Sequence, residues 1–153
     1  MRRAHRRRGF FHKHSLSLVS AAILGLWIVL YADADPSTHL GSFFGNAIAD
    51  WTGLLVTVLA TKFLFEVGSA ESRRPPDLWF TPIRKWLEDH SLTIFLAITG
   101  LGWVWLYASM NSEGKWGQVV GNIVSEWTQI FGLVILSKRL VETHSKESAS
   151  QKH

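Results

Sequence analysis

Two acidic side chains are set apart from the other charged residues because each lies inside a long apolar stretch of the chain. An asparagine precedes each acid by four residues, so the pairs are Asn46 with Asp50 and Asn122 with Glu126. Four residues make about one helical turn, which places each amide beside its carboxylate on one helix face. A carboxylate that binds and releases a proton or cation, next to an amide that replaces water, is what an ion pathway in a membrane requires.

Polar or small residues continue along the same two faces. Gly53 and Thr57 follow Asp50 at intervals of three and four residues, and Gln129 and Ser137 extend the second face. These intervals are those of one side of a helix, so the two polar faces are expected to meet inside a helical bundle. The predicted ion-binding residues are Asp50, Glu126, Asn46, Asn122, Thr57 and Gln129.

Four apolar stretches organise the chain. Only 18% of the 153 residues are charged, against about 25% in an average soluble domain. A hydrocarbon core about 30 Å thick requires about 20 apolar residues in a helix, so the sequence predicts an integral membrane protein. The stretches, which hold only two of the 28 charged side chains, are 15–32, 43–61, 91–108 and 119–137, and the second and fourth helices are expected to run to about 65 and 141.

The depth of the two acids has more than one interpretation. Trp51 and Trp127 directly follow the acids, and tryptophan prefers the level of the lipid headgroups, where the acids would be hydrated. The apolar part of the second span would then run only from Trp51 to Phe65, about 22 Å of helix, which is short for the hydrocarbon core. Hydrogen bonds between helices, worth only about 0.6 kcal/mol each, are another structural role. Structural roles and transport both stay open at this stage.

The chain contains an internal repeat with an offset of 76 residues. Residues 14–66 align with residues 90–142 without a gap, and 17 of the 53 positions are identical. Asp50 matches Glu126, and the identities include polar and aromatic residues, which shared hydrophobicity does not explain. Among the identical positions are His14-Ser15-Leu16, Trp27, Leu30-Tyr31-Ala32, Gly41, Gly45-Asn46, Trp51-Thr52, Lys62 and Glu66.

Each repeat unit predicts a helical hairpin. Because each unit contains two spans, both hairpins are expected to have the same orientation in the membrane. The predicted fold class is therefore all-α: an integral membrane four-helix bundle made of two parallel tandem helical-hairpin repeats. The predicted units are a basic N-terminal segment at 1–13, repeat 1 at 14–69, a linker with an interfacial helix at 70–89, repeat 2 at 90–145 and a tail at 146–153.

A short amphipathic helix is expected between the repeats. Pro75-Pro76 is incompatible with a helix, whereas Thr81-Pro82 suits the start of one. After it, Trp86 and its apolar neighbours alternate with charged residues at helical spacing. This pattern is typical of a helix lying in the membrane interface, here on the cytoplasmic side.

The distribution of Lys and Arg predicts the topology. Fifteen of these sixteen residues lie in the three segments that four spans place on one side, and only Lys115 lies in the other two loops. The positive-inside rule then places both termini in the cytoplasm, and the expected location is the bacterial cytoplasmic membrane. Five arginines before the first span are expected to bind anionic lipid headgroups rather than nucleic acid: Arg2, Arg3, Arg6, Arg7 and Arg8.

A cleaved leader is the alternative for the N-terminus. Arg7-Arg8, the following apolar run and Ala32-Asp33-Ala34 resemble a twin-arginine signal peptide with a small-residue cleavage site. The repeat argues against cleavage, because the first span has a counterpart at 91–108 with the same flanking residues. Sequencing of the mature N-terminus decides between the two, since a chain that begins at Asp35 would contradict four spans.

Titratable residues gather at the predicted cytoplasmic ends of the spans. Lys62 with Glu66, and Lys138 with Glu142, have the i, i+4 spacing of weak local ion pairs, with the lysines reaching toward the interface. The alternative is a cytoplasmic gate that includes the matched histidines and therefore responds to pH. The residues of this gate would be His14, His90, Lys62, Glu66, Lys138 and Glu142.

The sequence favours a membrane protein without catalysis. It shows no motif for nucleophilic catalysis, phosphate binding or dinucleotide binding, so we do not expect an enzyme. Cysteine is absent and the histidines lack the spacing of metal ligands, so neither a metal nor another cofactor is expected. The leading hypothesis is an ion or proton channel or transporter that forms a homo-oligomer. The alternative is a membrane scaffold or accessory subunit of a larger membrane complex, which would contact its partner through the eight tryptophans.

Overall fold

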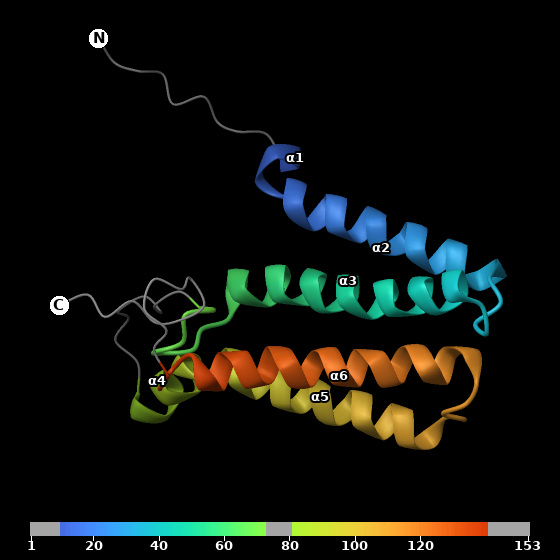
Figure 1. Ribbon diagram of the computed structural model, residues 1–153. Coiled ribbons are helices and arrows are strands. Elements are labelled where there is room, and N and C mark those ends of the chain that lie inside the picture. The colour runs from blue at the N-terminus through green and yellow to red at the C-terminus, as the bar shows by residue number, and fades with distance from the viewer. Residues whose placement is uncertain (1–9, 73–80, 141–153) are drawn as a thin grey trace, which may run out of the picture.

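The computed structural model describes residues 10–72 and 81–140, and every regular element in these two ranges is a helix. Four of the helices are long and apolar enough to span a membrane, which confirms the four predicted spans. A short helix precedes the first and the third of them (Figure 1). The elements are α1 (Phe10–Lys13), α2 (Ser15–Asp33), α3 (His39–Phe63), α4 (Pro82–Asp89), α5 (Ser91–Ser109) and α6 (Lys115–Leu136).

The second and fourth spans begin about four residues earlier than hydropathy indicated. α3 begins at His39 because Thr38 caps it, with its hydroxyl accepting a backbone N–H of the first turn at 3.1 Å. α6 begins at Lys115. The first turns of α3 and α6 contain polar residues, so a search for apolar stretches in the sequence does not include them. Both helices also end earlier than expected, at Phe63 and Leu136.

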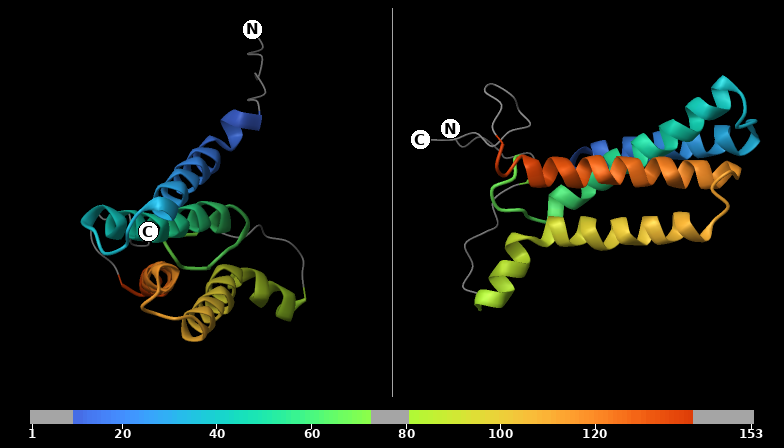
Figure 2. Two further views of the ribbon diagram at one scale, coloured as in Figure 1. Left: turned by 90° about the vertical axis from the view of Figure 1, so that its right-hand side faces the viewer. Right: turned by 60° about the horizontal axis from the view of Figure 1, so that its bottom comes forward.

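The four long helices form a row with α3 and α6 at its centre. α2 packs on α3, α3 on α6 and α6 on α5, and the end-on view in Figure 2 shows the same order. The predicted four-helix bundle is therefore an open one, in which α2 and α5 each pack chiefly on one neighbour. The even-numbered spans, α3 and α6, which carry the two predicted polar faces, are the pair that meets in the middle.

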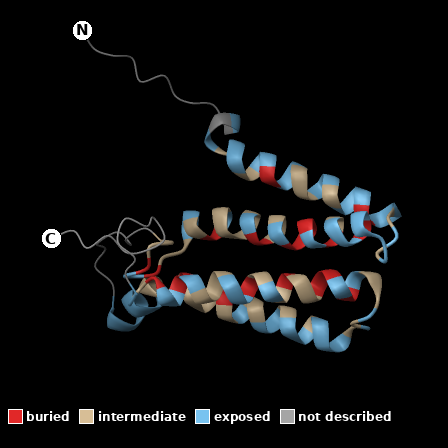
Figure 3. Ribbon diagram, in the orientation of Figure 1, coloured by how far each residue is buried: buried red, intermediate tan, exposed pale blue. Residues whose placement is uncertain are grey.

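The distribution of buried residues reflects the order of the four helices in the row. Buried residues concentrate on α3 and α6, whereas α2 and α5 have only two buried residues each and most of α2 is exposed (Figure 3). In a membrane such apolar surface faces lipid, which is as apolar as the side chains themselves. The buried residues of the two flanking helices are Ser20 and Tyr31 on α2, and Leu92 and Leu96 on α5.

The two ends of the row have different structures. We call the end with the tight loops 34–38 and 110–114 the loop end, and the opposite end, where residues 64–72 leave α3, the connector end. At the connector end, α1 meets α2 at His14 and α4 meets α5 at His90, with backbone angles φ −120°, ψ 12° and φ −120°, ψ 16°. The predicted helix between the repeats is confirmed as α4, whose exposed apolar side chains are Ile83, Trp86 and Leu87.

The loops at the loop end have the same hydrogen bonds at positions 76 residues apart. Oδ1 of Asp35 accepts the N–H of Ser37 at 2.9 Å, and Oδ1 of Asn111 accepts the N–H of Glu113 at 3.1 Å. Such turns, in which a side chain binds the backbone two residues on, are typical of Asp and Asn. The bonds from Ser37, first from its backbone N–H and then from its hydroxyl, hold the pKa of the Asp35 carboxyl below its usual value.

Two equivalent glycines provide a test of this loop packing. A Cβ at Gly41 would lie 1.9 Å from the carbonyl oxygen of Asp35, and a Cβ at Gly117 would lie 2.1 Å from that of Asn111. Gly41→Ala and Gly117→Ala should each lower the free energy of unfolding by about 1–3 kcal/mol, because backbone must move. Thermal unfolding in detergent measures the effect, and Gly25→Ala, which meets nothing within 4 Å, is the matched control. Equal unfolding temperatures for all three variants would contradict the packing.

Candidate functional site

The predicted polar faces of α3 and α6 meet at two asparagines. Nδ2 of Asn122 donates a hydrogen bond to Oδ1 of Asn46 at 2.5 Å. These two residues occupy equivalent positions of the repeat, so the same residue of each hairpin contributes to the contact between the central helices. Asn122 is half-buried and Asn46 is exposed in the single chain.

One helical turn further from the loop end, Asp50 and Glu126 form an acid pair. The Asp50 carboxyl acts on the Glu126 carboxyl both through its charge and through a hydrogen bond between the two side chains. A hydrogen bond between two carboxyl groups requires a proton on one of them. The arrangement therefore suits a site that holds a proton or, when both groups are ionised, a cation.

The acid pair lies near the middle of both helices. Asp50 is about 16 Å along α3 from His39 and about 20 Å from Phe63, at a rise of about 1.5 Å per residue. Glu126 is likewise about 16 Å from Lys115, the first residue of α6. Neither acid lies in the first or last turns of its helix, where a membrane interface is expected.

A glycine makes room for the longer acid. A Cβ at Gly53 would lie 3.6 Å from Oε2 of Glu126 and 3.2 Å from Cδ1 of Ile130, so a larger residue would compete with these side chains for space. The equivalent position on α6 is Gln129, which is exposed. The two hairpins therefore present different residues at this position: a glycine beside the acid pair on α3 and an exposed glutamine on α6.

A polar hollow leads from the loop end to the asparagines. It has a volume of about 570 Å³, and its lining includes Asn46, Asn122, Gln118 and Glu113. Tyr107 also lines it and is 38% exposed. The hollow therefore gives the predicted site a polar approach from one side.

The structure brings four of the six predicted ion-binding residues together and leaves two apart. Thr57 lines a separate hollow of about 90 Å³ toward the connector end, and its backbone carbonyl accepts the hydroxyl of Thr61 at 2.6 Å. Gln129 is exposed on α6 and contributes none of the contacts described for the acid pair. Helical spacing alone does not distinguish these two residues from the four that meet.

A contact at the loop end was not expected from the sequence. The Tyr31 ring is 1% exposed and lies over Gly45, and its hydroxyl donates to the carbonyl oxygen of Lys115 at 2.7 Å. The ammonium group of Lys115 in turn donates to the carbonyl oxygens of Ala32 and Ala34 at 2.9 and 2.6 Å. These bonds join the end of α2 to the start of α6.

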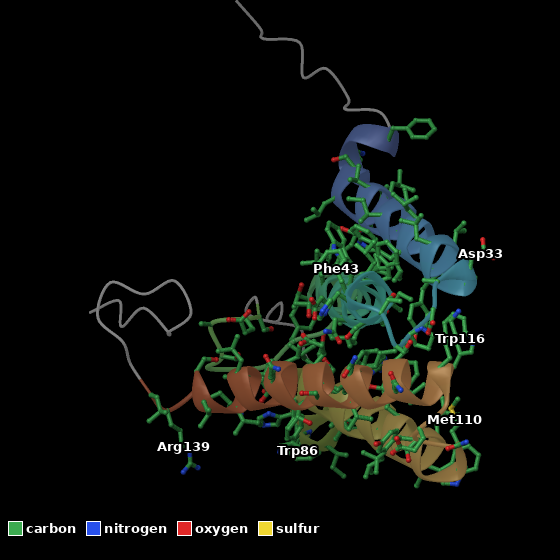
Figure 4. All side chains as sticks on the ribbon, turned by 45° about the vertical axis from the view of Figure 1, so that its right-hand side comes forward. Asp33, Phe43, Trp86, Met110, Trp116 and Arg139 are labelled. Carbon is green, nitrogen blue, oxygen red and sulfur yellow. The ribbon has the colours of Figure 1, made fainter. Side chains whose placement is uncertain are left out.

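Tyr31 and its equivalent, Tyr107, lie differently. Tyr31 also contacts the Trp116 ring, with the centroids 5.3 Å apart, where the end of α2 approaches α6 (Figure 4). Tyr107 packs on Gly121 as Tyr31 packs on Gly45, yet it lines the polar hollow. The match of Tyr31 with Tyr107 in the repeat is the sequence signal for this contact, but the match does not show which of the two tyrosines is buried.

At the connector end, a buried carboxylate joins the two hairpins. Oε1 of Glu66 accepts hydrogen bonds from Lys138 at 2.5 Å and from Nδ1 of His90 at 2.7 Å, and Oε2 accepts the N–H of Thr93 at 3.2 Å. Glu66 is 1% exposed. We call these four residues the Glu66 cluster.

The Glu66 cluster differs from the predicted local ion pairs. α3 ends at Phe63, so Glu66 no longer lies on the helix face of Lys62 and instead turns to the second hairpin. Lys62 lies beside His14, with Nζ 2.9 Å from Nδ1. The predicted pair of Lys138 with Glu142 and the predicted lipid contacts of the N-terminal arginines involve residues outside the described ranges.

The Glu66 cluster sets the ionisation of its carboxylate. Burial alone would raise the pKa of Glu66, but hydrogen bonds from Lys138, the N–H of Thr93 and His90 together outweigh it and lower that pKa below its usual value. A carboxylate with a lowered pKa stabilises the folded state at pH values above its unfolded pKa. This contribution is lost as the pH falls through the folded pKa.

The comparisons with known proteins found no match among family models, curated proteins or solved structures. Within residues 10–72 and 81–140, no group of three or more His, Asp or Glu side chains could hold a metal ion.

Lys138→Met tests the Glu66 cluster. The substitution should lower the free energy of unfolding by about 3 kcal/mol at neutral pH, because it breaks a buried ion pair. This value is at the low end for such a change, since His90 and Thr93 still bind the carboxylate. It should also flatten the fall in stability between pH 5 and pH 3, because the pKa of Glu66 moves up. Thermal unfolding across this range measures both effects. Lys85→Met, at an exposed position on α4, is the control, and an equal effect there would contradict the assignment.

Proposed function

We propose that the protein is an ion or proton channel or transporter in which Asp50 and Glu126 bind the transported ion. The observation that carries the proposal is the contact between these two carboxyl groups near the middle of two helices long and apolar enough to span a membrane. A carboxylate at the centre of a span costs about 2.5–3.5 kcal/mol to insert, so acids there are functional as a rule. A proton shared by the pair lowers this cost and is itself a candidate for transport.

The surroundings of the acid pair support a route to one side. The polar hollow at the loop end reaches Asn46 and Asn122, and the acid pair is one turn beyond them. Toward the connector end, the separate hollow beside Thr57 is lined mainly by apolar residues, among them Ile130 and Leu133. The Glu66 cluster, which includes three residues of the predicted cytoplasmic gate, Glu66, His90 and Lys138, joins the hairpins at that end. The route is therefore open at the loop end and closed toward the connector end.

The proposal includes two parallel hairpins related by a pseudo-twofold axis between α3 and α6. The contact of Asn46 with Asn122 supports it, because an axis of this kind brings equivalent residues face to face. The distribution of Lys and Arg supports a cytoplasmic connector end in a bacterial membrane. The N-terminal arginines would then bind anionic lipid headgroups on that side.

We further propose that the protein is a homo-oligomer. Asp50 is exposed in the single chain although it lies on a helix long and apolar enough to span a membrane. A polar side chain that faces hydrocarbon is unfavourable, whereas a second copy would cover it.

A scaffold or accessory subunit is the second candidate. α5 exposes Ile98, Leu101 and Trp105 at 65%, 70% and 72%, and a ridge of this kind suits contact with a larger partner as well as with lipid. Purification from native membranes distinguishes the candidates: a stoichiometric second protein supports the accessory subunit, and a homo-oligomer alone supports the channel.

The proposal is tested by flux into liposomes that contain the purified protein. The double variant Asp50→Asn with Glu126→Gln should reduce proton or monovalent-cation flux at least tenfold, because amides do not exchange protons or bind cations as carboxylates do. Asp33→Asn, which changes an exposed acid at the end of α2, should leave the flux unchanged. Equal flux in the double variant would contradict the proposal. A natural protein that is folded and conducts nothing would also contradict it and would favour the scaffold.

A further inference from the structure

The small hollow beside Thr57 lies between three of the spans. Its lining includes Thr57 and Thr61 from α3, the buried Leu96 from α5 and Leu133 from α6. We call it the inner hollow. Its volume of about 90 Å³ exceeds the roughly 30 Å³ that one water molecule takes in the liquid. The two threonine hydroxyls give water the polar partners that it needs inside a protein.

The inner hollow adjoins a larger one at the connector end. This outer hollow has a volume of about 520 Å³, and Ser17 and Lys62 are among its lining residues. Thr61 and Glu71 line both hollows. The two hollows are therefore neighbours that meet at these two residues.

The outer hollow marks a difference between the two hairpins. At an offset of 76, Lys62 matches Lys138 and Ser17 matches Thr93. In the second hairpin, Lys138 and Thr93 bind the buried carboxylate of Glu66, whereas the matched residues of the first hairpin line the outer hollow. The connector end is therefore closed on one side and hollowed on the other.

The Ile130 side chain lies between the acid pair and the inner hollow. A Cβ at Gly53 would lie 3.2 Å from Cδ1 of Ile130 and 3.6 Å from Oε2 of Glu126, so both side chains reach the same point of α3. Ile130 is one turn nearer the connector end than Glu126, and it also lines the inner hollow. Apolar constrictions of this kind stop conduction by excluding water.

We propose that protons pass between the acid pair and the connector end through the inner and outer hollows, and that Ile130 is the apolar barrier on this path. The inference rests on the proposed function and adds to it the second half of the route. Water in the inner hollow would take the proton from the acid pair once the barrier is wetted. The threonine hydroxyls would hold that water by hydrogen bonds.

The outer hollow favours a proton over a metal cation. Lys13 and Lys62 line it against a single acid, Glu71. A metal cation would have to pass these two ammonium groups as a mobile charge, whereas a proton is relayed between water molecules. The ion named in the inference is therefore the proton.

Two substitutions of the same shape separate polarity from size at Ile130. Valine and threonine differ by a methyl in place of a hydroxyl, so Ile130→Val and Ile130→Thr open the same space. In liposomes that contain the purified full chain, Ile130→Thr should raise proton flux about tenfold and Ile130→Val no more than about threefold, because a hydroxyl wets an apolar constriction. Ile135→Thr, at an exposed position of α6, should leave the flux unchanged. Sodium flux should stay at the level of empty liposomes.

The same assay distinguishes failure of this inference from failure of the proposed function. With Asp50→Asn and Glu126→Gln also present, Ile130→Thr should give no rise. A rise that persists without the acids, sodium flux, or equal proton flux in Ile130→Thr and Ile130→Val would overturn the inference and leave the acid pair to its own test. A natural protein that is folded and conducts nothing would overturn both.

The accessibility of Thr61 tests the path without a change at Ile130. The chain contains no cysteine, so Thr61→Cys introduces a single thiol. In membrane vesicles of either orientation, a small membrane-impermeant thiol reagent should modify it from the connector side only. Modification should lower proton flux about fivefold by filling the path.

Thr128→Cys is the matched control for Thr61→Cys. The hydroxyls of both threonines bind the carbonyl oxygen four residues earlier, at 2.6 Å for Thr61 and 2.8 Å for Thr128. Thr128, however, lines an apolar hollow between α5 and α6, so its cysteine variant should stay unmodified from both sides. Modification of Thr61→Cys from the loop side, its absence from both sides, or full proton flux after modification would each contradict the proposed path.

Discussion

Polar groups between α3 and α6 must satisfy one another, because hydrocarbon provides no hydrogen bonds. Asn46 and Asn122 do so directly, and the carboxyl groups of Asp50 and Glu126 do so one turn deeper. This constraint determines which faces of the two central helices meet. It also places α2 and α5 on the outside, where apolar side chains need only lipid.

The two ends of the row meet the same constraint in different ways. At the loop end, Lys115 and Tyr31 bind backbone carbonyls, so the start of α6 is attached to the end of α2 without a buried charge pair. At the connector end, Glu66 is fully covered and three donors from the second hairpin bind it. The acid pair lies between these attachments, so small relative movements of the hairpins would change its geometry.

Much of the fold could be predicted from the sequence, because span length and helix periodicity are local properties. The four spans, the helix at Pro82–Asp89 and the meeting of the two acidic faces follow from such patterns. The partners of Glu66 do not, because they depend on where α3 ends. An i, i+4 spacing implies a contact only while the helix continues, and Phe63 is its last residue. Thr57 and Gln129 share a periodicity with the acids but not their neighbours.

The space beneath Gly53 shows what a duplicated chain permits. Glu126 extends its carboxylate toward this glycine, and the equivalent position in the other half is a glutamine. In a dimer of identical hairpins every substitution would occur twice, so a glycine and the longer acid that faces it would have to arise together in both copies. Joining the two hairpins in one chain separates their mutations. One half can then contribute the glycine and the other the longer side chain beside it, so the two matched acids can differ in length, as Asp50 and Glu126 do.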